Sequence, residues 1–435
     1  MRWPAAEWST SYAARVLAAI AGIAICWTCN YGEVTVVSPA PHGPGTLTLS
    51  VQVDPEDTAV ARKLGWGGHI PAAEVTVTAG GGDTAVGPPV ATVQTDSAGM
   101  VSVPDLPDGS YFVQVRRLLT ATEAAQLAPT DDVIGFMGQA VVARGGVTVS
   151  IPASRRRSVV ISEWAFQPQW IPAVSAWYYF GGFLELANNA DTTVYLDGLV
   201  IGEGFIQAFD LPSPHTCAEA ESYSNDPNGI WARFFDSIPG TGHTHPLAPG
   251  AVAVIATDAI DHSAVVPGGL DLSHADFDFV GTSDVVNPTV PNTISLGPED
   301  YLFGHGLFLN EELAEVVFVA MPVDTSGLPK QWTAIQGNEY ERMPRARVLD
   351  AIALLSPHQY TTSPLCPHLV HSNFDRYRGG FAPIGAFTLG GNPEGLYSVQ
   401  RKVAYTRADR RKILQHTRTT DADFFYGLRT PFQLP

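Results

Sequence analysis

Hydrophobic and polar residues alternate along much of this chain, in short runs separated by turn residues. The clearest case is the segment from Phe183 to Gly202, FLELANNADTTVYLDGLVIG. Apolar residues at every second position, interrupted by Asn-Asn-Ala-Asp and by Asp-Gly, predict three short antiparallel strands joined by two turns. If Leu184 and Leu186 face the core, the alternation places Glu185 toward solvent or a loop.

The same pattern extends from Gly45 to about Pro152. Short alternating runs of Leu, Val and Ile are separated by Gly- and Pro-rich turns, which is typical of an antiparallel sandwich. The runs are Leu47–Val53, Val75–Val77, Val101–Val103, Val113–Val115 and Val147–Ile151. Leu118–Leu127 predicts a short helix, with Thr120 as its N-cap and Glu123 three residues later.

The pattern therefore predicts an all-β protein of two sandwiches. We divide the chain into a signal or anchor segment (1–29), a linker (30–44), a small sandwich (45–153) and a larger sandwich (158–435). Ser154–Ser158 holds three arginines between the sandwiches and is interpreted as a solvated linker. A sandwich needs about 100 residues, so the larger part must carry insertions, where binding functions usually lie. These are predicted at Gly204–His245, Asp284–Asp300, Pro322–Met343 and Ser356–Gly380.

The N-terminus has the features of an export signal. Val16–Trp27 is apolar, and it is shorter than the roughly 20 residues that span a bilayer. Cys29 is the preferred lipidation site, ahead of Cys26, so we expect an exported protein at the outer membrane or cell surface. Membrane contact would be made only through that anchor. The formal net charge of -18 repels nucleic acid, which we exclude as a partner.

The remaining cysteines and several histidines offer candidate cross-links and metal ligands. Export favours a disulfide between Cys217 and Cys366, and two unpaired thiols are the alternative. A zinc site needs three or four converging donors. The candidate donors are His243, His245, His368 and His371. Because the chain has 12 histidines, loop histidines without a metal are the simpler interpretation.

Carboxylates supply two further candidate sites. Asp271, Asp276 and Asp278 could bind calcium, the one cofactor that the chain suggests, but core-facing Phe277 and Phe279 already explain this segment. A glycosidase-type pair could involve Glu163 and Glu185, for which structural hydrogen bonding is the preferred interpretation. The sequence contains no G-x-S-x-G elbow, H-E-x-x-H motif or P-loop.

Two stretches resemble known β-modules. Thr95–Val115 follows the order T-D-x-x-G-x-V-x-V-x-x-L-P-x-G-x-Y-x-V-x-V and resembles carboxypeptidase-regulatory-like, prealbumin-like sandwiches. The resemblance implies that Gly99 permits a tight turn and that Tyr111 anchors the strand after the Pro107–Gly109 corner. It also implies a non-catalytic spacer or binding module.

The larger part resembles lamin-tail-like domains, which are immunoglobulin-type sandwiches. The similar motifs occur in the family's order at Val160–Glu163, Glu185–Asn188, Leu196–Gly198, Leu247–Gly250, Val348–Ile352 and Ser398–Lys402. Together the two modules resemble an uncharacterised family of exported bacterial lipoproteins. We therefore expect a non-catalytic binding or structural protein with an unknown protein or glycan ligand. The alternatives are a metal-assisted extracellular hydrolase and a carbohydrate-binding protein.

Overall fold

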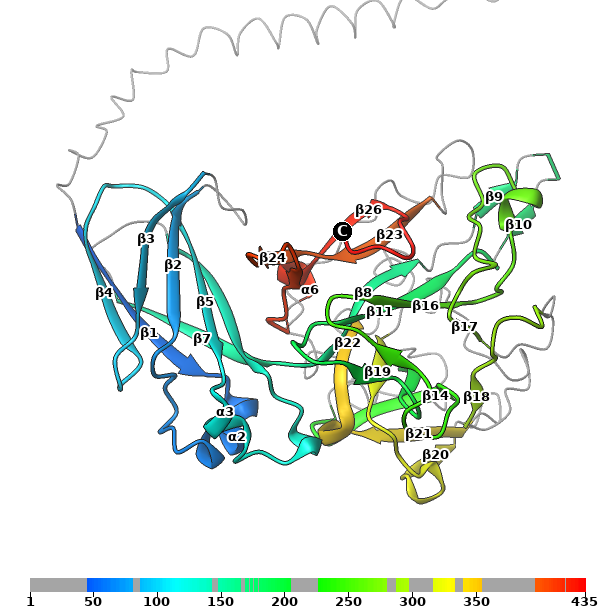
Figure 1. The fold of residues 1–435 in the computed structure, drawn as a ribbon, viewed down its shortest axis with the longest axis horizontal. Helices are drawn as coiled ribbons and strands as arrows, with labels where there is room; N and C mark the ends of the chain where they lie inside the picture. The colour runs from blue at the N-terminus through cyan, green and yellow to red at the C-terminus, as the bar shows by residue number, and fades with distance from the viewer. Residues whose placement is uncertain are drawn as a thin grey trace, which may run out of the picture.

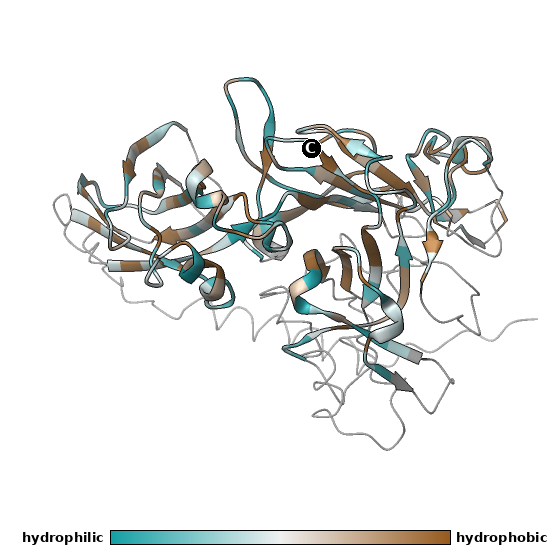
Figure 2. Cartoon of the chain, turned by 60° about the horizontal axis from the view of Figure 1, so that its bottom comes forward, coloured by the Kyte–Doolittle hydropathy of each residue, from teal (hydrophilic) through white to brown (hydrophobic). Residues whose placement is uncertain are grey.

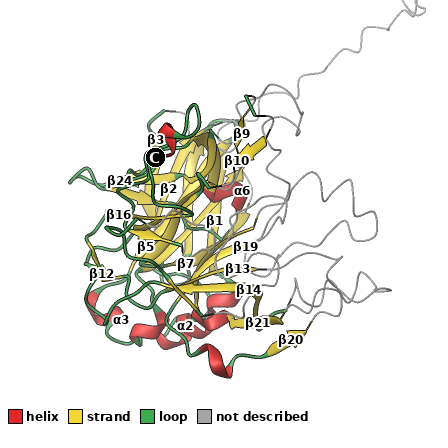
Figure 3. Cartoon of the chain, turned by 90° about the vertical axis from the view of Figure 1, so that its right-hand side faces the viewer, coloured by secondary structure: helices red, strands yellow, loops and turns green. Residues whose placement is uncertain are grey.

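The computed structural model describes residues 45–80, 87–142, 148–165, 169–171, 173–174, 176–178, 180–204, 226–279, 287–296, 316–332, 339–353, 396–418 and 420–435. Strands dominate these residues, and the helices are few and short (Figures 1 and 3). The protein is thus an all-β sandwich protein, as the alternating pattern predicts. Within the described ranges, the helices are too short or too polar to cross a membrane.

The first sheet has seven strands in the order β3-β2-β5-β6-β7-β1-β4. They are β1 (Gly45–Val53), β2 (Glu74–Ala79), β3 (Pro89–Gln94), β4 (Met100–Leu106), β5 (Tyr111–Leu118), β6 (Gly135–Val142) and β7 (Thr148–Arg156). The edge strands β3 and β4 also contact each other, so the sheet curls around its own core. Trp66 packs in that core, with its ring centroid 5.2 Å from that of Phe136.

Most features predicted for the first sheet are confirmed. Four of the five apolar runs lie in strands, as does the described part of the fifth, from Thr148 on. Tyr111 donates its hydroxyl hydrogen to the Pro107 carbonyl. Gly99 has a φ of +72°, and a Cβ there would overlap the Val51 carbonyl. The predicted helix is shorter, α3 (Ala121–Ala124), with the capping box of Thr120 present.

Three features of this part were not predicted. Strands β1 and β7 pair in parallel, whereas the pattern indicated an antiparallel sandwich. Strand β6 has no alternation at its start because Gly135–Gly138 is buried on both faces. The short helix α2 (Thr58–Lys63) follows a 3-10 turn at Pro55–Asp57.

Two further sheets form the rest of the protein. The second sheet has the order β17-β16-β11-β8-β23-β26, and the third has the order β20-β21-β14-β13-β19-β22, with β18 added beside β14. The second sheet contains β8 (Val159–Ala165), β11 (Phe183–Asn188), β16 (Val252–Ala256), β17 (Phe277–Asp278), β23 (Tyr397–Arg401) and β26 (Phe424–Leu428). The third contains β13 (Val200–Gly204), β14 (Gly229–Ser237), β18 (Ile294–Ser295), β19 (Val316–Ala320), β20 (Lys330–Trp332), β21 (Glu339–Pro344) and β22 (Val348–Ala353).

The main core of this part lies between the second and third sheets. It combines Ile161, Leu184 and Leu186 of the second sheet with Ile201 and Val319 of the third. Figure 2 shows the hydrophobic residues concentrated on these strands. Three small pairs complete the fold: β9 (Gln169–Ile171) with β10 (Ala176–Tyr178), β12 (Val194–Tyr195) with β15 (Pro246–Leu247), and β24 (Val403–Thr406) with β25 (Lys412–Leu414).

The structure confirms the positions of the three strands predicted within Phe183–Gly202, which are β11, β12 and β13, but they belong to three different sheets and do not pair with one another. Of the two orientations predicted for Glu185, solvent or a loop, the structure shows the loop: the side chain meets the segment after β26 and its exposed fraction is 0%. The structure corrects two predicted insertions. Gly204–His245 contains β14, and Pro322–Met343 contains β20 and most of β21, so both stretches supply strands to the third sheet.

We predict that Gly202→Ala destabilises the third sheet. Gly202 pairs with Phe318 of β19, and a Cβ at Gly202 would overlap the Phe318 ring, which belongs to a buried cluster. Overpacking of this kind costs about 1–3 kcal/mol, to be measured by urea unfolding. Gly67→Ala is the matched control, because no atom lies within 4 Å of its added Cβ. Equal losses in both variants would contradict this account.

Candidate functional site

Two glutamates face each other on the outer face of the second sheet. Glu163 of β8 pairs directly with Glu185 of β11, next to an irregularity in the ladder at which Ser162 is the extra residue. Glu185 points away from the main core because it alternates with Leu184 and Leu186, and the bulge turns Glu163 to the same side. Each glutamate has an exposed fraction of 0%. The structure thus brings together the two carboxylates for which we expected structural hydrogen bonding.

Glu163 is surrounded by hydrogen-bond donors. Its Oε1 accepts from Ser398 Oγ at 2.6 Å and from the Thr430 amide at 2.9 Å. Its Oε2 accepts from Thr430 Oγ1 at 3.1 Å. Burial raises the pKa of Glu163, and these hydrogen bonds oppose the rise. The donor set is the one that an ionised carboxylate requires.

Glu185 also accepts hydrogen bonds from its surroundings. Ser162 Oγ donates to Glu185 Oε1 at 2.7 Å and lies 3.1 Å from the Glu185 carbonyl oxygen. Burial raises the pKa of Glu185 to about 8, Ser162 opposes the rise, and Glu163 adds to it. The two carboxyls therefore hold one proton between them near neutral pH.

The segment after β26 covers this glutamate pair. The Phe432 amide donates to Glu185 Oε2 at 2.8 Å, and Arg429 Nη1 donates to the Gly181 carbonyl at 3.0 Å. Apolar clusters flank the pair on the same face, one around Phe183 and one around Val160. The pair is enclosed by its own chain, which leaves no room for a substrate at the carboxyl oxygens.

A buried ion pair joins the second sheet to the third. Asp350 of β22 binds Arg401 of β23, and the two side chains are 5% and 1% exposed. Asp350 also accepts from the Ile161 amide at 2.8 Å, while Arg401 Nε donates to the Ile161 carbonyl at 2.6 Å. These side chains therefore complete the backbone bonding of β8 where no neighbouring strand reaches it. Burial works against ionised Asp350, but the charges of Arg401 and His416 hold its pKa below the usual range.

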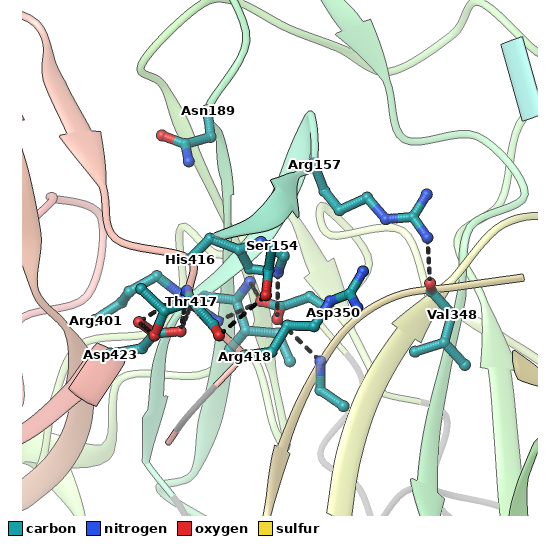
Figure 4. Close-up of polar contacts among 12 residues, drawn as sticks. Ser154, Arg157, Asn189, Val348, Asp350, Arg401, His416, Thr417, Arg418 and Asp423 are labelled. Atoms are coloured by element: carbon teal, nitrogen blue, oxygen red, sulfur yellow. Dashed lines mark hydrogen bonds and ion pairs between the residues drawn. The ribbon is translucent and has the colours of Figure 1, made fainter. Parts of the chain in front are cut away.

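The same network continues to the first sheet (Figure 4). His416 lies 3.3 Å from Asp350 through Nε2 and 3.0 Å from the Arg155 carbonyl through Nδ1. Asp423 accepts from the Thr417 amide and hydroxyl, and Ser154 Oγ at the end of β7 lies 3.4 Å from the Thr417 carbonyl. Residues 415–418 thus lie between the two parts of the molecule.

The arginines between the sandwiches are buried, which corrects the predicted solvated linker at Ser154–Ser158. Arg156 and Arg157 are 3% and 1% exposed. Arg157 donates to the Asp131 carbonyl at 2.7 Å and to the Val348 carbonyl at 3.1 Å, so it bridges the first and third sheets. Burial lowers the pKa of Arg157 to about 9. A run of three arginines resembles a solvated linker in sequence because its acceptors lie far away along the chain.

Asp57 is the carboxylate that offsets this positive charge. It is fully buried and forms 2.8 Å ion pairs with Arg155 and Arg418. Burial opposes its ionisation, but these two arginines and a backbone hydrogen bond hold its pKa below the usual range. Glu56 adds contacts to Arg345 and Arg418. The two parts are therefore joined by buried charges rather than by a flexible tether.

The predicted zinc ligands lie only partly within the described residues. The His243 ring stacks edge-on against Tyr195 at 4.5 Å, and the His245 ring stacks against Phe277 at 4.9 Å. His368 and His371 lie outside the described residues, as do Cys217, Cys366, Cys26 and Cys29. In the described part of the chain, no three His, Cys, Asp or Glu side chains gather as a metal site.

The calcium candidates have separate roles in the structure. Asp271 accepts from the Ser273 amide at 3.0 Å, Asp276 accepts from the Val254 amide at 2.8 Å, and Asp278 accepts from the Ala259 amide at 3.1 Å. The expected inward orientation of Phe277 and Phe279 is confirmed, since both are 2% exposed. Each aspartate thus stabilises a different piece of backbone.

The fold and the buried charged residues describe an all-β protein. Its first sheet curls around its own core, its second and third sheets pack on each other, and charged contacts join the two parts. The family described as "Protein of unknown function (DUF4876)" matches residues 248–430, which include β16 to β26. A DUF4876 family protein from Bacteroides thetaiotaomicron is similar over 90% of this chain and 98% of its own, with 18% identity and a TM-score of 0.49. The major pilin SpaD from Corynebacterium diphtheriae covers 37% of this chain and 43% of its own, with 14% identity and a TM-score of 0.16. No curated protein matches the chain.

Sequence reasoning missed the joining residues Asp57, Asp350, Arg401 and Arg418. A signal was present for one of them, because Asp350 lies within a strand that is otherwise apolar. A charged residue inside such a strand is rarely buried without a partner, so a cationic partner for Asp350 could have been expected. No comparable signal marks Asp57 or Arg418, which lie in turns.

We predict that Glu185→Gln makes folding less sensitive to pH. The folded pKa of about 8 exceeds the ordinary value of 4.5, so the folded state holds this proton more tightly than the unfolded state. The contribution of this proton to the free energy of unfolding is fully present below about pH 4.5. It is lost as pH rises toward 8, at no more than about 1.4 kcal/mol per pH unit. Gln mimics the protonated form, so urea midpoints of variant and wild type should be similar at pH 5, with the variant higher at pH 8.5. A difference that does not change with pH would disprove the one-proton arrangement.

We predict that Asp350→Asn costs about 3–5 kcal/mol, because Arg401 would keep a buried charge without its main partner. Asp191→Asn is the matched control. Asp191 also binds two arginines, Arg407 and Arg411, but its side chain is 55% exposed, so its loss should cost less than about 1 kcal/mol. Chemical denaturation of both variants measures the difference. Similar small losses would show that the Asp350 pair does not hold the sheets together.

Proposed function

We propose that this protein is an exported, non-catalytic binding or structural module. The observation that carries the proposal is the enclosure of the glutamate pair. The carboxyl oxygens of Glu163 and Glu185 are taken up by donors from β8, β23 and the segment after β26. A general acid and base must reach a substrate directly or through one water. Here both carboxyl groups stabilise the fold.

The buried connection between the two parts supports the same proposal. Asp57, Arg157 and Arg418 fix the first sheet against the other two sheets. A rigid connection of this kind suits a spacer that holds a binding surface at a set distance and orientation. We propose that the first sheet is a prealbumin-like spacer and that the remainder is a lamin-tail-like module. The residues of the lamin-tail-like motifs, such as Glu163 and Arg401, support this assignment because they stabilise the sheet.

Export rests on the N-terminal pattern, which also gives the test. Full-length protein expressed in a bacterial host with a lipoprotein pathway should be found in the membrane fraction, with fatty acid on its N-terminal peptide by mass spectrometry. Cys29→Ser should release the protein into the soluble periplasmic or extracellular fraction, while Cys26→Ser should leave it anchored. A full-length chain with an uncleaved N-terminus in the cytoplasm would contradict the proposal.

A further inference from the structure

An open groove of about 900 Å³ lies beside the turn that joins β24 to β25. Four basic residues line it: Arg407, Arg410, Arg411 and Lys412. Its acidic lining residues are Asp191 and Asp409. The groove therefore has a local excess of positive charge on a chain whose formal net charge is -18. Such a local reversal attracts anions that the rest of the surface repels.

Two of the arginines, Arg407 and Arg411, are held in place by the surrounding fold. The stem of Arg411 lies against Gly250, whose added Cβ would overlap it, and Arg411 Nη1 donates to the Ala190 carbonyl. Arg407 Nη1 donates to Asp191 at 2.8 Å. The turn is closed by hydrogen bonds of 2.9 Å between Arg407 and Arg411 and between Arg410 and Arg407. A preorganised set of guanidinium groups loses little freedom when a ligand binds.

Arg410 is the lining residue that is most available to a ligand. It is exposed at the tip of the turn, where its backbone has a left-handed φ of +69°. Arg407, Arg411 and Lys412 all have contacts within the protein, the last with the carbonyls of Leu434 and Pro435. Arg410 can therefore offer its full fork of donors to an oxyanion.

The lining also indicates which anion fits. Asp191 and Asp409 beside the arginines provide acceptors as well as donors. A ligand of phosphates alone would offer no donors to these two carboxylates, whereas a ligand with hydroxyl groups and carboxylates can use both kinds of lining group. Among the described residues, the groove lining includes no aromatic side chain that could serve as the apolar anchor of a protein partner. We propose that it binds an acidic saccharide, with Arg410 contacting a uronic-acid carboxylate. This inference rests on the proposed function and supplies its ligand class.

Titration calorimetry with the full chain tests the proposal. A short oligogalacturonate should bind, a neutral maltooligosaccharide of equal length should not, and raising salt from 50 to 300 mM should weaken binding. Arg410→Gln should weaken binding of the oligogalacturonate about tenfold without changing the unfolding midpoint, because the Arg410 side chain is exposed and makes no hydrogen bond or ion pair with the other described residues. Arg62→Gln is the matched control, since Arg62 is exposed on α2 and is not among the groove residues.

Several results would overturn the inference. Equal weakening in Arg410→Gln and Arg62→Gln would mean that binding is a general charge effect. Binding of the neutral saccharide would remove the role of the carboxylate, and equally tight binding of poly-L-glutamate would make the ligand an acidic peptide. Absence of oligogalacturonate binding would also overturn it. An exported, lipidated protein that binds none of these probes would leave the proposed function standing, whereas a cytoplasmic protein would contradict it.

Discussion

The structure depends most on the way strand β8 is completed. One edge of β8 pairs fully with β11, but the other meets β23 only at Trp164 and Glu163. The Ile161 amide and carbonyl are instead satisfied by Asp350 and Arg401. Buried backbone groups without hydrogen-bond partners are costly. This ion pair supplies the partners that a neighbouring strand would otherwise provide. Because Asp350 comes from β22, the same contact also attaches the third sheet to the second.

Where the first sheet meets the rest of the protein, the buried charges connect segments that are far apart in the chain. Asp57 forms ion pairs with Arg155 of its own sandwich and with Arg418 of the other part. Arg157 donates to a carbonyl of β22. Removing one member leaves the charges of the others buried without a partner. Because this is costly, such networks are rigid. The position of the first sheet is therefore set by the same kind of interaction that holds the two other sheets together.

Sequence reasoning predicted the local features well because they depend on near neighbours. Alternation predicted β11 and β13, and the Thr120–Glu123 spacing predicted the capping box. It was incomplete or wrong where distant segments decide the outcome. Alternation with leucines left open whether Glu185 faces solvent or a loop, and residues 429–433, which cover that face, decide it. Ser154–Ser158 has the composition of a linker, but its arginines pair with Asp57 and with the carbonyls of Asp131, Asn189 and Val348, which lie elsewhere in the chain.

The glutamate pair and the basic groove are both bordered by the segment after β26, but the pair is buried and acidic whereas the groove is open and basic. The residues after β26 pass over Glu163 and Glu185 and then continue to Gln433 and Leu434, which line the groove. Covering the carboxyls removes their charge from the surface, by protonation of one and by hydrogen bonding of the other. The arginines of the β24–β25 turn can then dominate the local potential of an otherwise acidic protein. An uncovered pair of ionised glutamates nearby would reduce this positive potential, so the covering segment serves both the stability of the sheet and the charge of the groove.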